Sequence, residues 1–456
     1  MSKNILEQIA EAPSIALERG LEKTEELEKE LISKKPVRAA EAYWRKLGPG
    51  LTTGAADDDP SGIATYSQTG AKYGFQLLWL APLTFPLMAV IQEMCARIGM
   101  VTGRGLARNI KLYYPRWAIM SVASILFFAN TFNLGADLGI MAKAAQLFIP
   151  KVSFFLLVAF FTLASLLLQI FTAYARYARY LKYLALVLFS YVISALCISL
   201  DWREVLGHTV MPSLTFSKDQ IFLICGILGT TISPYLFFWQ SSQEVEEEIL
   251  RGNKTVKERR RNTTREEIKR MRVDVWSGMF VSNLAMFFII VACAGALYKN
   301  GITDIVSADQ AALALRPFAG DLAYYLFALG ILGVGLLSVP VLAGSASYAL
   351  AESFGWKTGL YRKLKDARAF YGVIIISMIL GFLSNFIGID PIKFLIYAAV
   401  FNGITAGPLL FFIVRLSSKK EVMGKFKSSR LATAIGWLTV IIMLIAGGAT
   451  VISMLI

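Results

Sequence analysis

Charged side chains are scarce in this sequence, and histidine is almost absent. Charged residues make up 17% of the chain against 56% hydrophobic residues, whereas soluble domains carry about 25% charged residues. The one histidine, His208, falls in an expected outer loop, which excludes a histidine proton relay inside a membrane. No nucleophile–base pair is visible, so we expect no enzyme. The cysteines stand singly, without metal-ligand spacing, and we interpret them as small buried hydrophobic residues: Cys95, Cys197, Cys225 and Cys293.

Long runs without Asp, Glu, Lys or Arg recur throughout the chain. About 20 apolar residues in a helix cross the ~30 Å hydrocarbon core of a bilayer. A segment at about 48–66 is also apolar at both ends but contains Asp57, Asp58 and Asp59. With it, the pattern predicts an all-α membrane protein of about eleven transmembrane helices. The uninterrupted runs are 73–92, 117–136, 152–175, 183–200, 220–243, 275–298, 322–351, 369–389, 394–414 and 431–456.

The chain has a net charge of +14, and its Lys and Arg residues are unevenly distributed between the two ends of these helices. With the N-terminus in the cytoplasm and alternating sides, cytoplasmic segments hold 38 of the 46 Lys and Arg residues and outer loops hold seven, while Lys143 lies within a span. This excess is the positive-inside pattern. We therefore predict a multi-pass protein of the inner (plasma) membrane with a cytoplasmic N-terminus and an extracytoplasmic C-terminus, and no nucleic-acid partner.

The chain divides into four predicted parts. Residues 1–46 are a charged cytoplasmic segment, 47–200 and 219–416 are two five-helix repeats, and 430–456 is an additional helix. The first segment has no apolar core of a cleavable signal peptide.

Two charged stretches are interpreted as cytoplasmic surface. Residues 15–33 have the spacing of an amphipathic helix. The charged cytoplasmic loop 243–272 is expected to lie at the inner surface, where contact with anionic membrane lipids is plausible. At its start, Glu244 to Glu248 is interpreted as a solvated helix end, with a place in an inner vestibule as the alternative.

The first helix of each repeat is interrupted at a proline. The breaks fall at 57–62 and at 230–235, around Pro60 and Pro234. Proline removes a backbone donor and disrupts the preceding turn, and lipid offers no partner for the freed carbonyl groups. Corresponding breaks in two halves indicate an inverted-repeat transporter with its substrate site near the bilayer midplane.

Carboxylates inside a spanning helix are costly, at roughly 2.5–3.5 kcal/mol each on insertion scales. The three aspartates lie about ten residues, or ~15 Å, inside the expected boundary. Of the three we expect Asp59, beside Pro60, to be the main charged ligand, with Asp57 and Asp58 as accessory candidates. Their oxygen-rich surroundings suit a hard cation; the candidate ligands are Asp59, Ser61, Thr231, Ser233 and Tyr235. In the third span, Asp137 and Lys143 either line a cavity or Lys143 extends to the outer surface.

The residues around the breaks resemble the NRAMP family of divalent metal transporters. The resemblance runs from about residue 45 to 415 and implies an inverted-repeat fold of eleven or twelve helices that works by alternating access. Asp59-Pro60 matches the first half of the family's DPGN motif. The other similar segments are Gly48-Pro49-Gly50, 71–74, 77–79, 96–104 and Asn402-Gly403 with Pro408.

The sequence also departs from the family's metal site. Gly62, Ser233 and Tyr235 stand where the family has the Asn of DPGN and the Met and His of its sixth span. A glutamine ligand of the tenth span corresponds to Ala399. An acidic pair linked to proton coupling corresponds to Asn130 and Asn133, which we treat with Asn402 as accessory candidates.

The resemblance, with these departures, implies transport of Mg²⁺ or Mn²⁺ with weak or no proton coupling and no cofactor. A magnesium-transporting branch of the family also lacks the Met. Two alternatives stay open: the same scaffold carrying a small organic solute such as an amino acid, and a non-transporting sensor.

Overall fold

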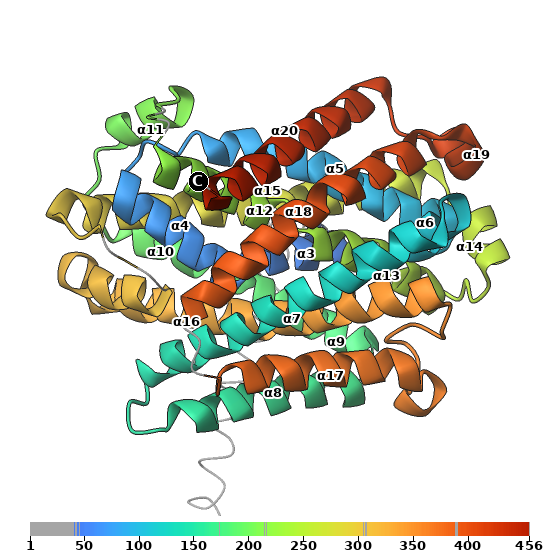
Figure 1. Cartoon of the computed structure of the whole chain (residues 1–456), viewed down its shortest axis with the longest axis horizontal. Helices are drawn as coiled ribbons and strands as arrows, with labels where there is room; N and C mark the ends of the chain where they lie inside the picture. Colours follow the sequence, from blue (N-terminus) through green and yellow to red (C-terminus); the bar gives the residue numbers. More distant parts are fainter. Residues whose placement is uncertain are drawn as a thin grey trace, which may run out of the picture. The chain divides into compact units, whose positions relative to one another are not determined.

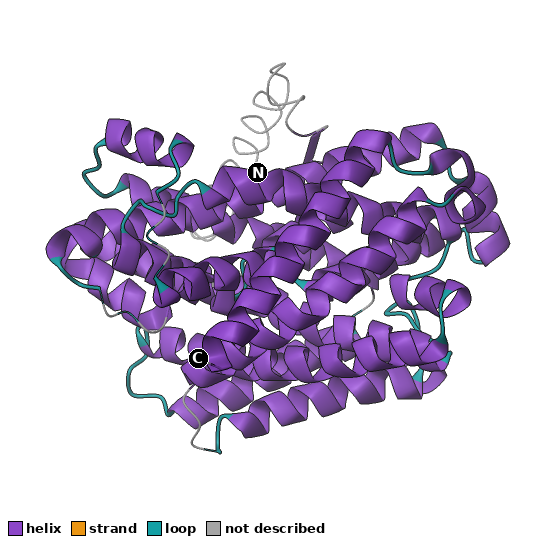
Figure 2. Cartoon of the chain, turned by 45° about the horizontal axis from the view of Figure 1, so that its top comes forward, coloured by secondary structure: helices purple, strands orange, loops and turns teal. Residues whose placement is uncertain are grey.

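The computed structural model describes residues 41, 43–44, 46–172, 174–213, 215, 217–303, 305, 308–387 and 391–455, without the side chains of 391–397, 399–400, 404, 450–451 and 453–455. Within these ranges every regular element is a helix (Figure 2). In chain order they are α3 (Pro49–Asp57), α4 (Pro60–Tyr73), α5 (Leu80–Thr102), α6 (Leu106–Tyr113), α7 (Arg116–Gln146), α8 (Phe154–Phe171), α9 (Tyr174–Leu184), η1 (Ala185–Leu188), α10 (Phe189–Leu196), α11 (Trp202–Val210), α12 (Lys218–Thr231), α13 (Pro234–Leu250), α14 (Val256–Asn262), α15 (Arg265–Ala296), η2 (Tyr298–Asn300), α16 (Ala308–Phe354), η3 (Leu364–Asp366), α17 (Arg368–Ser384), α18 (Pro391–Ser418), α19 (Lys420–Met423), η4 (Gly424–Phe426) and α20 (Arg430–Leu455).

The helices provide the predicted number of spans. In the described ranges, nine helical segments are long and apolar enough to cross a membrane, and α17 is a shorter apolar helix. The broken pair α3–α4 adds the eleventh. The all-α fold of about eleven helices is thus confirmed. Residues from Gly48 onward form one compact unit, while the boundaries of the four sequence-based parts stay predictions. The expected amphipathic helix at 15–33 lies outside the described residues.

Burial distinguishes inner from outer spans. In the most apolar 18-residue stretch, 89% of α5 is buried, but only 33% of α8 and 28% of α20. The exposed residues of α8 and α20 are themselves large and apolar, including Phe160 and Ile445. An apolar helix that keeps an apolar exposed face fits a lipid environment. In Figure 1, α8 runs beside α17 along one edge of the bundle, and α20 packs on α18 at the other.

Short helices between the spans gather at the two ends of the bundle. α6, α14 and α19 lie together at one end and α11 lies at the other (Figure 1). The connections with α6, α14 and α19 are those rich in Lys and Arg, as the alternation of sides requires. Which end faces the cytoplasm stays a prediction.

Both predicted helix breaks are present. α3 ends at Asp57 and α4 begins at Pro60, while α12 ends at Thr231 and α13 begins at Pro234. The proline at the first position of each second half needs no backbone donor there, which is why each new helix starts at that residue.

The half-helix α3 lies directly against the backbone of α15. A Cβ placed on Gly54 would be 2.2 Å from the carbonyl oxygen of Gly278, and one on Gly278 would be 2.1 Å from that of Gly50. Only glycine permits this approach. From α15, the Asp274 carboxylate accepts hydrogen bonds from the backbone nitrogens of Gly48 (2.7 Å), Gly50 (2.7 Å) and Leu51 (3.1 Å). Asp274 thereby satisfies donors at the start of α3 that have no partner within that helix.

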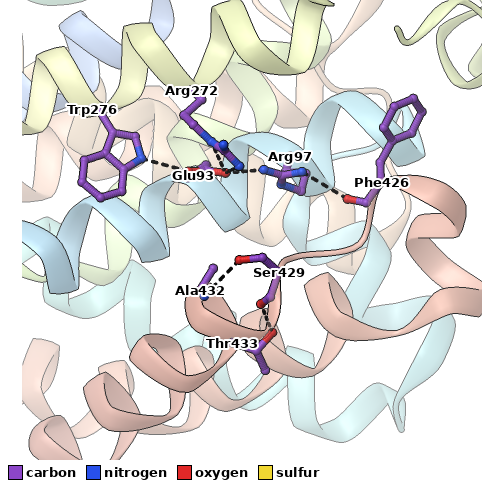
Figure 3. A network of polar contacts seen from close by, with 8 residues as sticks. All are labelled: Glu93, Arg97, Arg272, Trp276, Phe426, Ser429, Ala432 and Thr433. Carbon is purple, nitrogen blue, oxygen red and sulfur yellow. Dashed lines mark hydrogen bonds and ion pairs between the residues drawn. The ribbon is translucent and has the colours of Figure 1, made fainter. Parts of the chain in front are cut away.

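A polar network joins α5, α15 and the segment before α20 (Figure 3). Glu93 accepts hydrogen bonds from Arg97, from Arg272 (3.0 Å) and from the indole nitrogen of Trp276 (2.8 Å). Arg97 also donates to the carbonyl oxygen of Phe426 (3.3 Å). Farther along the same segment, the backbone nitrogen of Ala432 donates to the Ser429 hydroxyl (3.2 Å) and the Thr433 hydroxyl donates to the Ser429 carbonyl oxygen (2.9 Å), which closes the first turn of α20.

The interpretation of Glu244 to Glu248 as a solvated helix end was wrong. Helix α13 continues to Leu250, and Glu244, Glu246 and Glu248 are buried at 6%, 2% and 2% exposure. The expected loop 243–272 is likewise mostly helical, because α14 and the beginning of α15 occupy its second half.

Candidate functional site

Asp59 lies in the gap between α3 and α4 and is 3% exposed. One carboxylate oxygen accepts hydrogen bonds from the Ser61 hydroxyl (2.6 Å) and the Gly62 nitrogen (2.7 Å), so Asp59 is the N-cap of α4. The other accepts from the Asn133 amide (2.7 Å) and the Tyr235 hydroxyl (3.4 Å). Three separate helices therefore supply donors to this one carboxylate.

Tyr235 also connects the two breaks. Its hydroxyl donates to the carbonyl oxygen of Ala56 (2.8 Å), near the end of α3. Its own carbonyl oxygen accepts a hydrogen bond from the Ser345 hydroxyl of α16. The Ala56 carbonyl group, freed at the end of α3, thus has an internal partner in this conformation, as a membrane interior requires.

Asp57 and Asp58 are fully buried but poorly partnered. Asp57 accepts one hydrogen bond, from the Ser282 hydroxyl of α15 (3.1 Å), and its other oxygen has none. Neither carboxylate oxygen of Asp58 has a hydrogen-bonding partner within the described ranges. A buried charge without a partner is strongly unfavourable, so these two side chains require a proton or a cation.

Asp137 of α7 belongs to the same site. It accepts hydrogen bonds from the Ser61 nitrogen (3.2 Å) and the Ser338 hydroxyl of α16 (3.4 Å). Asp137 is fully buried, whereas Lys143, six residues farther along α7, is half-buried, and the choice between the two alternatives for Lys143 stays a prediction. Sequence reasoning did not select Ser282 or Ser338. The only signal was a serine within an uncharged span, which is too common to single out.

Some expected ligands point elsewhere. The hydroxyls of Thr231 and Ser233 donate to carbonyl groups of their own helix turn, at Ile227 and Thr230. Asn130 donates to the Leu342 carbonyl oxygen at 3.1 Å instead of reaching Asp59.

The accessory candidate Asn402 forms no hydrogen bond with Asp59. Asn402 is buried, and its amide oxygen has no partner in the described part. The side chain of Ala399 lies outside the described part. Thus Asp59, Ser61, Tyr235 and Asn133 are joined by hydrogen bonds, whereas Thr231, Ser233, Asn130 and Asn402 form none with Asp59 in this conformation.

The site can hold a cation through few charged ligands only. Among the described residues, no three Asp, Glu, His or Cys side chains converge on a point that could hold a metal ion. Successive residues at a helix break point in different directions, so at most one or two carboxylates reach one ion. No described Lys or Arg forms an ion pair with Asp57, Asp58, Asp59 or Asp137. No ion pair among the described residues therefore compensates these carboxylates.

In the described residues, eleven helical spans with two proline breaks around buried carboxylates define a secondary transporter of the inverted-repeat class. The comparison with known sequences identifies which one. The family profile "Natural resistance-associated macrophage protein-like" (Nramp) matches residues 50–453, and the chain belongs to this family of multi-pass membrane transporters.

Curated relatives match over almost the whole chain. A protein named divalent metal cation transporter MntH from Klebsiella pneumoniae subsp. pneumoniae is 25% identical over 418 residues, covering 90% of this chain and 94% of the relative. The protein of the same name from Pectobacterium carotovorum is 26% identical over 406 residues, covering 87% and 91%.

Solved structures confirm the fold. A manganese transporter from Eremococcus coleocola has a TM-score of 0.69 at 18% identity and covers 89% of this chain and 86% of its own. Mhp1, a nucleobase-cation-symport-1 family transporter, has a TM-score of 0.56 at 15% identity, covering 89% and 91%. At these identities the likeness concerns the fold alone.

Proposed function

We propose that this protein transports a hard divalent cation, Mg²⁺ or Mn²⁺, across the inner membrane by alternating access, with weak or no proton coupling. The two repeats move around the breaks in α3–α4 and α12–α13, and the N-terminus lies in the cytoplasm. Relatives named as divalent metal cation transporters support the substrate class.

The observation that carries the proposal is the uncompensated charge at the first break. Asp57, Asp58 and Asp59 are 0%, 0% and 3% exposed, and no basic side chain of the described chain pairs with them. No donor in the described part of the chain forms a hydrogen bond with Asp58. A cation that enters this site supplies the missing positive charge, and its departure restores the unfavourable state.

The composition of the site favours a partly hydrated ion. One or two carboxylates with neutral oxygens and waters are the ligands that Mg²⁺ takes in proteins. A thioether lies beside the second break: the sulfur of Met286 on α15 is 4.0 Å from the Thr231 hydroxyl, which in turn is 3.3 Å from that of Tyr66. Sulfur favours softer ions than Mg²⁺, so replacing Met286 tests whether this thioether contributes to the choice between Mg²⁺ and Mn²⁺.

The test is cation influx into liposomes containing the purified protein, under an inside-negative potential. Wild-type protein is expected to show saturable Mg²⁺ or Mn²⁺ influx that Asp58→Asn and Asp59→Asn abolish. Asparagine at position 59 can still cap α4, so the second variant separates charge from folding. Asp366→Asn, in the exposed η3, is the matched control and should transport normally.

The same vesicles distinguish the finer claims. Met286→Leu should lower the ratio of Mn²⁺ to Mg²⁺ flux, and a pH-sensitive dye inside the vesicles should report little proton entry. Folded wild-type protein without flux of either ion would refute the proposal and would direct the search to small organic solutes.

A further inference from the structure

A second polar cavity lies away from the helix breaks, at the end of the bundle where α6 and α14 lie (Figure 1). Its volume is ≈ 280 Å³, and its walls come from the turn before α6, from α13, α14 and the end of α16, and from the loop after α16. No residue of either break lines it. Five cationic side chains and two carboxylates do: Arg104, Arg108, Arg259, Lys357 and Arg362, with Glu246 and Glu352.

Both carboxylates of the cavity accept hydrogen bonds from other residues of the protein. Glu246 accepts hydrogen bonds from the Tyr348 hydroxyl (2.6 Å) and from the backbone nitrogens of Leu360 (2.7 Å) and Tyr361 (3.0 Å). Glu352 accepts one from the backbone nitrogen of Arg108 (3.0 Å). Glu246 thus binds the backbone of the loop after α16, and Glu352 binds the backbone of α6 near its start. Neither glutamate forms an ion pair with an arginine or lysine side chain of the described residues.

The arginine and lysine side chains of the cavity differ in how many hydrogen bonds they form. Within the described chain, the side chains of Arg104, Arg108 and Lys357 form no hydrogen bond or ion pair. Arg362 uses its Nε for the Thr358 carbonyl oxygen (3.1 Å). Arg259 is 6% exposed and donates three hydrogen bonds to backbone carbonyl groups, so it forms part of the wall.

We propose that this cavity binds a phosphate group, carried by a phospholipid headgroup or by a small soluble phosphate ester. Arginine presents a planar fork of donors that matches phosphate oxygens. Basic cavities between membrane helices on the cytoplasmic side are typical headgroup sites. The volume suits a ligand at the small end of the usual range, which starts at about 300 Å³. Trp356, which lines the cavity, is 40% exposed, and aromatic residues of this kind gather at membrane interfaces.

The experiment measures thermal unfolding of the purified full-length protein in detergent. The probes are inorganic phosphate and dihexanoyl phosphatidylglycerol, with sodium chloride at equal ionic strength as the reference. A ligand that binds only the folded state raises the unfolding midpoint with its concentration. The test variant is R104Q/R108Q; the matched control is R260Q/R261Q, which removes two exposed arginines of α14 that do not line the cavity.

Wild type and control should be stabilised by at least one probe, and the test variant should need about tenfold more of it for the same shift, since hydrogen bonds to charged groups are lost. Stabilisation by inorganic phosphate assigns a soluble ester; stabilisation by phosphatidylglycerol alone assigns a lipid headgroup. Equal response of test and control variants, or no response of wild type, overturns the proposal. If R104Q/R108Q does not fold, Lys357→Gln replaces it, and this variant should also need more of the probe for the same shift of the unfolding midpoint, by a smaller factor.

Discussion

Removing the Asp274 carboxylate should release α3 from α15. This one side chain accepts three hydrogen bonds from the start of α3, at 2.7, 2.7 and 3.1 Å. Hydrogen bonds to a charged group contribute about 1.5–3 kcal/mol each, but the three share one carboxylate, and loss of a capping side chain costs about 0.5–2 kcal/mol. We therefore expect Asp274→Ala to weaken the docking of α3 by about 2–4 kcal/mol, which is roughly a 30- to 1,000-fold shift toward the detached state.

The shift is measured as the rate at which a cysteine in α3 reacts with a soluble thiol reagent. Ala55 is 1% exposed, so Ala55→Cys should react slowly in wild type and much faster in the Asp274→Ala background. Cys197 and Cys225, which are not buried, are first replaced by serine.

Two variants calibrate this experiment. Asp274→Asn should give an intermediate rate because its amide oxygen still accepts hydrogen bonds. Arg265→Ala, at an exposed position on the same helix, should leave the rate unchanged. An unaltered rate in folded Asp274→Ala protein would refute the role of this carboxylate in holding α3.

Three further substitutions have defined outcomes. Glu93→Gln removes the charge at the centre of the network in Figure 3 and should lower the free energy of unfolding by about 1–3 kcal/mol, measured by thermal or denaturant unfolding in detergent; an unchanged value would contradict this. Tyr235→Phe removes the hydroxyl that donates to the Ala56 carbonyl oxygen of α3. Calorimetry should then show two- to tenfold tighter Mn²⁺ binding, which corresponds to roughly one hydrogen bond. Weaker binding would show that the hydroxyl is itself a ligand. Gly278→Leu cannot fit against α3 and should abolish the monodisperse peak in size-exclusion chromatography, whereas Gly207→Ala, where a Cβ meets nothing within 4 Å, should be neutral.

The helices and their breaks were predictable because their causes are local. A run of uncharged residues identifies a span wherever it occurs, and proline interrupts a helix through its own ring and missing donor, so Pro60 and Pro234 fell where the halves begin. The pairing of Asp59 with Ser61 is also local, since the two are two residues apart.

The rest of the site depends on contacts between distant segments. Ser282 and Ser338 meet Asp57 and Asp137 across 225 and 201 residues, and nothing in a single sequence connects these positions. The wrong interpretation of Glu244 to Glu248 has the same origin. A cluster of glutamates is usually solvated, but Glu246 is buried because the backbone nitrogens of a loop more than a hundred residues later donate to it.

The donors around Asp59 have a consequence for selectivity. Two hydroxyls, one amide and one backbone nitrogen already stand where a ligand would, so an arriving ion must compete with the protein's own hydrogen bonds before it gains the carboxylate. The affinity that an experiment records is the intrinsic affinity reduced by this exchange. On the proposed function, this competition disfavours monovalent ions, which the carboxylate attracts more weakly than divalent ones, and the same four donors replace a divalent ion when it leaves.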